Sequence, residues 1–260
     1  MIIVVMPSTY QQVGRIIADI EHEGFRLANA RTFSLFESPE VREALASIDA
    51  PVQVVDEGSG IGVYIAFQGS DSVKKIREMI LDLHHRYGTG IVFFRSIGEV
   101  ENMENMLFAS KVKVTATYDN CTCCVIKPHA LKSRVAGEIL NAILSDGYEV
   151  SAMQIFHLDR TSAAEFYEIY DGVVKEFHSM VDELTSGPAM ALEIRAENAV
   201  STFRQSAGPW DVGMAKELYP STLRARFGKN RVENAIHCTD LEGDGVSEVA
   251  YFFQILACSC

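Results

Sequence analysis

The sequence predicts an α+β protein of two related domains, each a four-stranded antiparallel sheet with helices packed on it. Two observations lead to this fold. The first is an internal repeat, and the second is that strand-like and helix-like segments follow in the same order in both copies. With 260 residues, 48% of them hydrophobic, the chain is long enough to form two ordinary cores.

The repeat is clearest in two helix-like segments that end at glycines. Gly14 corresponds to Gly137, and Gly24 corresponds to Gly147. Apolar residues recur at helical spacing between each pair, and a glycine suited to a left-handed position then ends the helix before an alternating, strand-like segment. The other matching pairs are Ile16 with Ile139, Ile20 with Ile143, and Phe25 with Tyr148.

Strand-like segments flank each helix in the same way. A short apolar run ending in proline precedes it, Ile2–Pro7 in the first copy and Cys123–Pro128 in the second. A third strand follows at Gly60–Phe67 and at Gly187–Ile194. Each copy therefore reads strand-helix-strand-helix-strand-helix-strand, the split pattern of a ferredoxin-like (βαββαβ) domain, with helices expected on one face of the sheet.

The boundary between the copies is expected near residues 116–120, where the polar segment 118–120 precedes the second apolar strand. We therefore predict a first domain at residues 1–117 and a second at residues 118–257. No Pro/Gly-rich linker separates them, so we expect the two domains to pack closely, as a pseudo-dimer within one chain.

Composition excludes several classes of function. The net charge is −12 and no Lys/Arg-rich segment is present, so nucleic acid is not an expected partner. No apolar run approaches the roughly 20 residues of a membrane-spanning helix, and Met1–Met6 is too short for a secretory signal, so we expect a cytoplasmic protein without a membrane partner. The six cysteines lack zinc-ligand spacing and are expected to be reduced thiols, with Cys258–Cys260 a frayed tail.

One histidine ends a strand-like run beside a polar turn, and a carboxylate follows it on a predicted helix. These residues are His237 and Glu248. A carboxylate that holds one imidazole nitrogen fixes the tautomer and leaves the other nitrogen as a nucleophile. A lone histidine beside apolar residues is more often structural, and a helix glutamate is more often solvated. The pair therefore indicates a catalytic site only if further functional residues surround it.

Phosphoryl transfer would supply such residues, because it needs fixed cations around a leaving phosphate. The candidates are Lys127, Arg204 and Arg224, each of which taken alone would be read as a surface cation. The segment 208–228, with two prolines and Trp210, is long enough to be a functional loop.

An ordered series of motifs carries a family resemblance over residues 121–256. The motifs are Ile126-Lys-Pro128, Ser186-Gly-Pro188, Thr222-Leu-Arg224, Phe227-Gly228 and Asn234-Ala-Ile-His237-Cys-Thr-Asp240. Together they resemble the nucleoside diphosphate kinases. The variants around Trp210 and Cys238 are most similar to the two-domain, cilium-associated branch of that family, here expected without an N-terminal DM10 domain. The first half resembles the family only at residues 1–33 and 58–108.

The resemblance implies a ping-pong kinase that moves the γ-phosphate of ATP or another nucleoside triphosphate to a nucleoside diphosphate through a phosphohistidine. It also implies Mg²⁺ as cofactor, held mainly by the nucleotide phosphates rather than by a protein metal site. The implied catalytic residues are His237, Glu248 and Lys127. The implied nucleotide-binding residues are Lys127 and Asn234 on sugar hydroxyls and phosphate oxygens, Tyr167 beside the transferring phosphate, Arg204 and Arg224 on the phosphates, and Thr239, which stands in the usual serine position.

Departures from the family pattern predict reduced nucleotide affinity. An acidic residue, Glu176, aligns near the aromatic residue that usually meets the base, and Trp210 replaces a phosphate-contacting threonine. His129 and Cys238 replace the usual aspartate and glycine of their motifs. In the first copy, Met6 replaces the lysine and the arginine-bearing loop is missing, so we expect that copy to be inactive.

Two alternative functions remain open from the sequence. The resembling branch is associated with γ-tubulin complexes and axonemal microtubules, so the chain would then be a weakly active or inactive structural or regulatory component, located at the basal body or axoneme. A module that senses nucleotides without transferring phosphate is the other alternative.

Overall fold

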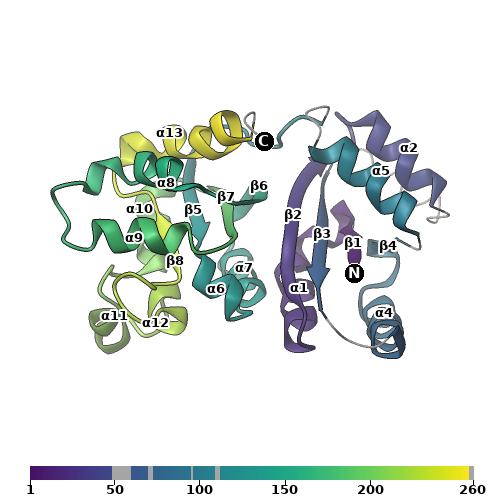
Figure 1. Cartoon of the computed structure of the whole chain (residues 1–260), viewed down its shortest axis with the longest axis horizontal. Coiled ribbons are helices and arrows are strands. Elements are labelled where there is room, and N and C mark those ends of the chain that lie inside the picture. Colours follow the sequence, from purple (N-terminus) through teal and green to yellow (C-terminus); the bar gives the residue numbers. More distant parts are fainter. Residues whose placement is uncertain (49–59, 70–72, 95, 109–111, 258–260) are drawn as a thin grey trace.

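A computed structural model describes residues 1–48, 60–69, 73–94, 96–108 and 112–257. It shows two halves side by side, with strands of both halves meeting in the middle of the molecule (Figure 1). The tail Cys258–Cys260 lies outside the described residues. None of the described helices combines the length and the apolar composition needed to cross a bilayer.

The elements follow the predicted order. The first half contains β1 (Ile2–Val5), α1 (Val13–His22), β2 (Arg26–Ser34), α2 (Pro39–Ser47), β3 (Ile61–Gln68), α4 (Val73–Tyr87), β4 (Ile91–Phe93) and α5 (Ile97–Phe108). The second half contains β5 (Cys121–Ile126), α6 (Pro128–Lys132), α7 (Ala136–Ser145), β6 (Glu149–Phe156), α8 (Arg160–Phe166), α9 (Phe177–Leu184), β7 (Ala189–Arg195), α10 (Ala199–Ala207), α11 (Val212–Leu218), α12 (Leu223–Phe227), β8 (Ile236–Cys238) and α13 (Gly245–Ala250).

The strands form one sheet rather than two. Their order is β4-β1-β3-β2-β6-β7-β5-β8, and every paired strand is antiparallel. The α+β class and the antiparallel pairing are therefore confirmed, but the expectation of two separate four-stranded sheets is corrected. Each half does supply four strands in mirrored order, and β2 and β6 join them edge to edge.

The junction of the halves is symmetric about its centre. Arg31 of β2 pairs with Gln154 of β6, and these two residues have the same separation in sequence as Gly14 and Gly137. A residue that pairs with its own repeat counterpart lies on a pseudo-twofold axis, as in an isologous dimer contact. The β-bulges obey the same relation, since one falls between Leu27 and Asn29 and the other between Val150 and Ala152.

Helices α1 and α7 cross beside this junction at their matching glycines. A Cβ added to Gly14 would lie 2.3 Å from the backbone nitrogen of Asn141, and one added to Gly137 would lie 2.1 Å from that of Ala18. The two helix backbones therefore touch where the repeat places glycine in both. These contacts support the pseudo-dimer, while the domain boundary at residues 117 and 118 stays a prediction.

Helices cover both faces of the sheet, not one as expected. The α1 and α7 side carries a single core that runs through both halves and includes Ile17 and Leu140. The opposite face carries two separate cores, one under α2 and α5 in the first half and one under α8, α9 and α13 in the second. The unbroken burial of β5 from Cys121 to Ile126 reflects this two-sided covering.

Candidate active site

The second half holds a pocket of about 320 Å³ at the end of β5 and β8. Six of the residues expected from the sequence line it together, namely Lys127, Tyr167, Arg204, Arg224, Asn234 and His237. The other lining residues are Tyr170, Val174, Met180, Gly208, Pro209, Trp210, Ile236 and Asp240. Residues far apart in the chain thus converge on one concave site, which is the usual form of a small-molecule site.

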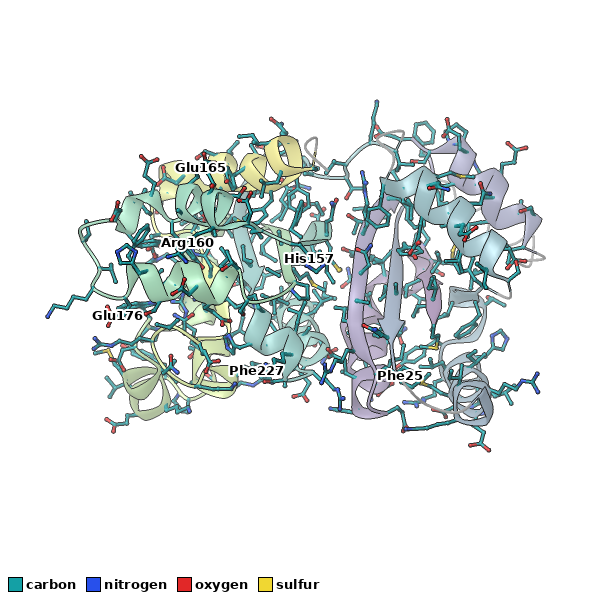
Figure 2. All side chains as sticks on the ribbon, viewed as in Figure 1. Phe25, His157, Arg160, Glu165, Glu176 and Phe227 are labelled. Carbon is teal, nitrogen blue, oxygen red and sulfur yellow. The ribbon has the colours of Figure 1, made fainter. Side chains whose placement is uncertain are left out.

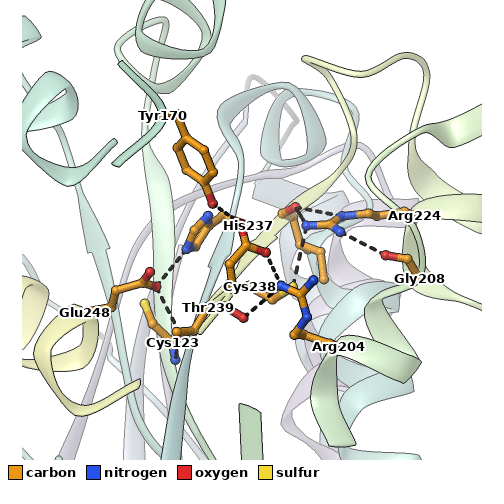
Figure 3. Close-up of polar contacts among 11 residues, drawn as sticks. Cys123, Tyr170, Arg204, Gly208, Arg224, His237, Cys238, Thr239 and Glu248 are labelled. Carbon is orange, nitrogen blue, oxygen red and sulfur yellow. Dashed lines mark hydrogen bonds and ion pairs between the residues drawn. The ribbon is translucent and has the colours of Figure 1, made fainter. Parts of the chain in front are cut away.

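The imidazole of His237 is held on one side by Glu248. The Nε2 atom lies 2.8 Å from Glu248 Oε2, and the two side chains are only 5% and 12% exposed (Figure 3). The rings of Phe166 and Tyr167 pack on the imidazole at centroid distances of 4.8 and 5.8 Å. The imidazole makes no other hydrogen bond within the described part of the chain, so Nδ1 is the nitrogen available to a ligand in the pocket.

Thr239 lies behind the imidazole rather than in the pocket. It is fully buried, its hydroxyl donates to Glu248 Oε2 at 2.9 Å, and the backbone N–H of Cys123 donates to that hydroxyl at 3.0 Å. Thr239 is not among the residues that line the pocket, and its expected contact with nucleotide stays a prediction. Its hydroxyl instead extends the chain of hydrogen bonds that fixes Glu248 against His237.

Lys127 enters the pocket as a buried lysine. Its side chain is 2% exposed and Nζ donates to Val232 O at 3.0 Å, which leaves further N–H donors for a ligand. Burial and the neighbouring charge of Arg224 lower the pKa of Lys127 to about 7. An anionic ligand would reverse this effect, because it favours the ammonium form.

Arg224 is oriented by backbone carbonyls. Its guanidinium donates to Gly208 O at 2.9 Å and to Ile236 O at 3.3 and 3.4 Å, and its NH2 group lies 3.5 Å from Cys238 Sγ. Cys238 therefore contacts the arginine from behind. The guanidinium is fixed before any ligand arrives, which is the preorganisation that electrostatic catalysis requires.

Arg204 is paired with a carboxylate inside the pocket. It donates to Asp240, and Tyr170 donates to the second oxygen of Asp240 at 2.5 Å. Burial tends to raise the pKa of Asp240, but the hydrogen bonds from Tyr170 and Arg204 outweigh burial and lower it. Sequence reasoning missed Tyr170 and this pairing, although Asp240 stands in the quoted histidine motif.

Two buried polar atoms of the pocket have no hydrogen-bond partner within the described residues. They are the hydroxyl of Tyr167 and Oδ1 of Asn234, whose residues are at most 1% exposed. Buried polar groups are normally paired, so unpaired ones that line a pocket indicate a polar ligand. A hydroxyl donor and an amide oxygen fit the phosphate and sugar groups of a nucleotide.

The departures from the family pattern meet at the rim. Trp210 lines the pocket, and the guanidinium of Arg231 lies over its ring at 5.7 Å. Arg231 also pairs with Asp211 at 2.7 Å and with Glu176 at 3.6 Å. Glu176 precedes α9, at the end of that helix away from the first half (Figure 2), and is not among the residues that line the pocket.

One group of side chains within the described residues has the geometry of a metal site. Ligand atoms of His129, Glu183 and Glu233 all lie within 4.8 Å of one another. Both imidazole nitrogens of His129 already have partners, however, one in Glu183 and the other in the backbone N–H of Ala235. A cation would have to displace one of them, so this group fits a hydrogen-bonded cluster better than a metal centre.

The first half has an apolar core where the second half has its pocket. By strand register, Val92 opposite Val4 corresponds to His237 opposite Val125. Val92 and Met6, the residue in place of the lysine, both belong to the core under α2 and α5. His84 and His85 end α4 and are exposed, so they do not replace the missing histidine.

Comparisons with known proteins agree with this geometry. The family model for nucleoside diphosphate kinase matches residues 120–257. A nucleoside diphosphate kinase of Nitratiruptor is 36% identical over 51% of this chain and 93% of its own length. A crystal structure of the Aquifex aeolicus nucleoside diphosphate kinase, 29% identical, covers 53% of this chain and 97% of that chain with a TM-score of 0.50.

The chain therefore belongs to the nucleoside diphosphate kinase family. Within that family it is similar to nucleoside diphosphate kinase homolog 7 of Rattus norvegicus, with 54% identity over 142 residues. This similarity confirms the resemblance to the homolog 7 branch. The match spans 55% of this chain but only 36% of the rat protein.

Proposed function

We propose that this chain is an active nucleoside diphosphate kinase, in which His237 takes the γ-phosphate of a nucleoside triphosphate and passes it to a nucleoside diphosphate. The observation that carries the proposal is the hydrogen bond from His237 Nε2 to Glu248, which leaves Nδ1 facing a pocket with three cationic side chains. Such a nucleophile with a fixed tautomer and an orienting carboxylate is the arrangement required for covalent catalysis.

Each half-reaction is an exchange of one bond at phosphorus. In the first, the Nδ1 lone pair attacks the γ-phosphorus, the bond to the bridging β–γ oxygen breaks, and the nucleoside diphosphate leaves with that electron pair. In the second, a terminal oxygen of another nucleoside diphosphate attacks the phosphorus and the N–P bond breaks. The proton on Nε2 stays in place throughout, and Glu248 balances the positive charge that the phosphorylated ring acquires.

The other lining residues would bind the phosphates and the base. Lys127 and Arg224 would neutralise phosphate oxygens, with Tyr167 and Asn234 supplying the unpaired polar atoms. Arg204 would share its guanidinium between the phosphates and Asp240. Val174, Met180 and Trp210 belong to the apolar part of the lining, against which the base would pack.

We propose Mg²⁺ as the cofactor, bound with the nucleotide. Asp240 is the single carboxylate in the pocket lining, and both of its oxygens already accept hydrogen bonds. The pocket thus fits a metal that arrives on the phosphates better than one held by the protein. When bound, Mg²⁺ would neutralise part of the phosphate charge.

We keep a second, structural proposal, in which the chain is a component of microtubule, γ-tubulin or axonemal assemblies. We also propose that the protein is cytoplasmic or cytoskeletal. Two contacts favour weak activity. Trp210 lines the pocket where the family usually has threonine, and the guanidinium of Arg204 already donates to Asp240, which leaves fewer of its N–H donors for phosphate. A scaffold, however, would have no physical need for the hydrogen bonds among His237, Glu248 and Thr239.

The test is acid-labile phosphate on the protein after incubation with Mg-ATP labelled at the γ-phosphate. We expect label on the wild-type chain and its release on addition of a nucleoside diphosphate. His237→Ala should take up none, whereas His157→Ala, which changes an exposed histidine after β6, should label normally. A wild-type chain that binds Mg-ATP without labelling would favour a nucleotide sensor, and one that does neither would favour the scaffold.

A further inference from the structure

A buried histidine–carboxylate pair lies next to the pocket, between α6 and α9. His129 and Glu183 are 4% and 9% exposed, and Nδ1 of the imidazole lies 2.7 Å from Glu183 Oε1. The same oxygen accepts the backbone N–H of His129 at 2.9 Å. His129 follows Lys127 by two residues, so the pair adjoins the site without lining the pocket.

The partners on both sides fix the tautomer of His129. Burial tends to raise the pKa of Glu183, but its hydrogen bonds from His129 outweigh burial and lower that pKa. Glu183 is therefore an ionised acceptor, and the proton must sit on Nδ1. Nε2 is then an acceptor, which matches its partner, the backbone N–H of Ala235 at 3.2 Å.

Ala235 occupies a strained turn. Its φ is 71°, in the left-handed region that residues other than glycine seldom adopt. The N–H of Ile236 donates to Asn234 O at 2.9 Å, which closes a three-residue turn around Ala235. That hydrogen bond and the positive φ correspond to the rarer, strained form of γ-turn.

Strained backbone persists only where its surroundings over-determine it. Two hydrogen bonds from outside the turn hold Ala235, since its N–H donates to His129 Nε2 and its carbonyl accepts the N–H of Lys127 at 3.0 Å. The residue before the turn is the pocket residue Asn234, and the strand after it carries His237. The direction of both side chains depends on the conformation of the turn.

We propose that His129, oriented by Glu183, is a positioning residue for phosphotransfer, because it holds the strained turn that sets Asn234 and His237 in the pocket. This inference rests on the proposed function. His129 contacts no expected substrate atom, so its effect is on the geometry of others. A displacement of about 1 Å in such a site can slow a reaction on the order of 100-fold.

Three variants separate positioning from folding. His129→Phe keeps a ring but removes the acceptor for the Ala235 N–H and leaves Glu183 without its imidazole partner. The double variant His129→Phe with Glu183→Leu also removes the buried carboxylate that the single variant leaves without its imidazole partner. It should therefore fold even if the single variant does not, although the backbone N–H of residue 129 loses its acceptor as well. Glu183→Gln keeps an oxygen that accepts from Nδ1–H. His178→Phe, an exposed histidine on the same helix as Glu183, is the matched control.

Two measurements are made on each full-length variant. The first is the rate of labelling by Mg-ATP, with KM and the maximal rate determined separately. The second is hydrogen exchange of the Ala235 amide, which reports the turn whether or not the protein is a kinase. In the double variant we expect labelling to slow about 10- to 100-fold, mainly in the maximal rate, and the Ala235 amide to exchange at least about 10-fold faster. His178→Phe should stay close to wild type. Glu183→Gln should keep the wild-type maximal rate and Ala235 protection but raise KM, because the carboxylate charge that favours the Lys127 ammonium is lost.

The outcomes separate this inference from the proposed function. If the wild-type chain is never labelled, the proposed function fails, and Ala235 exchange still shows whether His129 holds the turn. A folded double variant with wild-type labelling and wild-type Ala235 protection would overturn the inference. Titration with Zn²⁺ alone gives a third arm, because one bound ion that is lost in His129→Phe would show that this cluster is a metal site instead.

Discussion

Arg31 of β2 pairs with Gln154 of β6, the residue that the internal repeat makes its counterpart. In a dimer of identical chains, an arginine at this position would face a second arginine across the axis. Here the two copies have diverged, so glutamine replaces the second arginine, and the guanidinium of Arg31 donates to Leu107 O and Val112 O of its own half. Glu21 has diverged from its counterpart in the same way. It accepts the N–H of Gly137 at 2.9 Å, whereas the matching residue of the second copy is Leu144.

The crossing of α1 and α7 should not tolerate a methyl group at either glycine. Gly14→Ala or Gly137→Ala would place a Cβ within 2.3 Å of backbone atoms, so we expect the free energy of unfolding to fall by about 1–3 kcal/mol or more. Gly98→Ala is the control, because a Cβ there meets nothing within 4 Å. Denaturant unfolding measures both, and equal stabilities would contradict the close contact of the helices.

The affinity for Mg-ADP should depend on pH through Lys127. Its pKa is lowered from 10.5 to about 7, chiefly by burial, and phosphate binds the ammonium form. Affinity should therefore decrease as pH rises above 7, approaching tenfold per pH unit. Lys127→Met, which introduces the residue that Met6 provides in the first half, should bind weakly and lose this component. Titration calorimetry from pH 6 to 9 measures the difference between the two proteins.

Lys127 also makes the free energy of unfolding depend on pH, in the opposite direction to the affinity for Mg-ADP. The unfolded chain keeps the Lys127 proton up to about pH 10.5, whereas the nucleotide-free folded chain releases it near 7. The unfolded state therefore binds more protons between these values, and stability should rise with pH across that window. Lys127→Met should remove this rise, and an unchanged pH profile would argue against a lowered pKa.

Glu248→Gln should slow phosphate transfer while sparing nucleotide binding. Glutamine can still accept from His237 Nε2–H, but it no longer balances the charge of the phosphorylated ring. We expect labelling to slow by about 10- to 100-fold, with the Kd for Mg-ADP within about threefold of wild type. Glu242→Gln, an exposed residue before the same helix, is the control.

Nucleotide should bind once per chain, in the second half. Met6 and Val92 sit in an apolar core at the positions of Lys127 and His237, so the described residues of the first half offer no comparable site for phosphate at these positions. Trp210 is the single tryptophan and lines the pocket, so its fluorescence should report binding directly. Two equivalent sites by calorimetry, or one that survives Lys127→Met with Arg224→Met, would show that the wrong half is assigned.

The sequence predicts local features of this protein better than its long-range ones. Periodicity and the matching glycines locate α1, α7 and the strands, because these depend on neighbouring residues. The joining of the two sheets depends on the edge strands β2 and β6, which lie far apart in the chain. The spacing of apolar residues within a strand does not indicate which edge strand will pair with another. The motifs likewise identify the pocket residues. They do not predict that Arg204 pairs with Asp240 or that the Thr239 hydroxyl donates to Glu248, since side-chain directions depend on packing.

The pairing of β2 with β6 also changes how the molecule responds to dilution. Two separate chains that share a sheet come apart as their concentration falls, because association is bimolecular. Here both strands belong to one chain, so each meets the other at an effective concentration set by the connection between them. The junction between β2 and β6 therefore stays formed however few copies of the protein a cell contains.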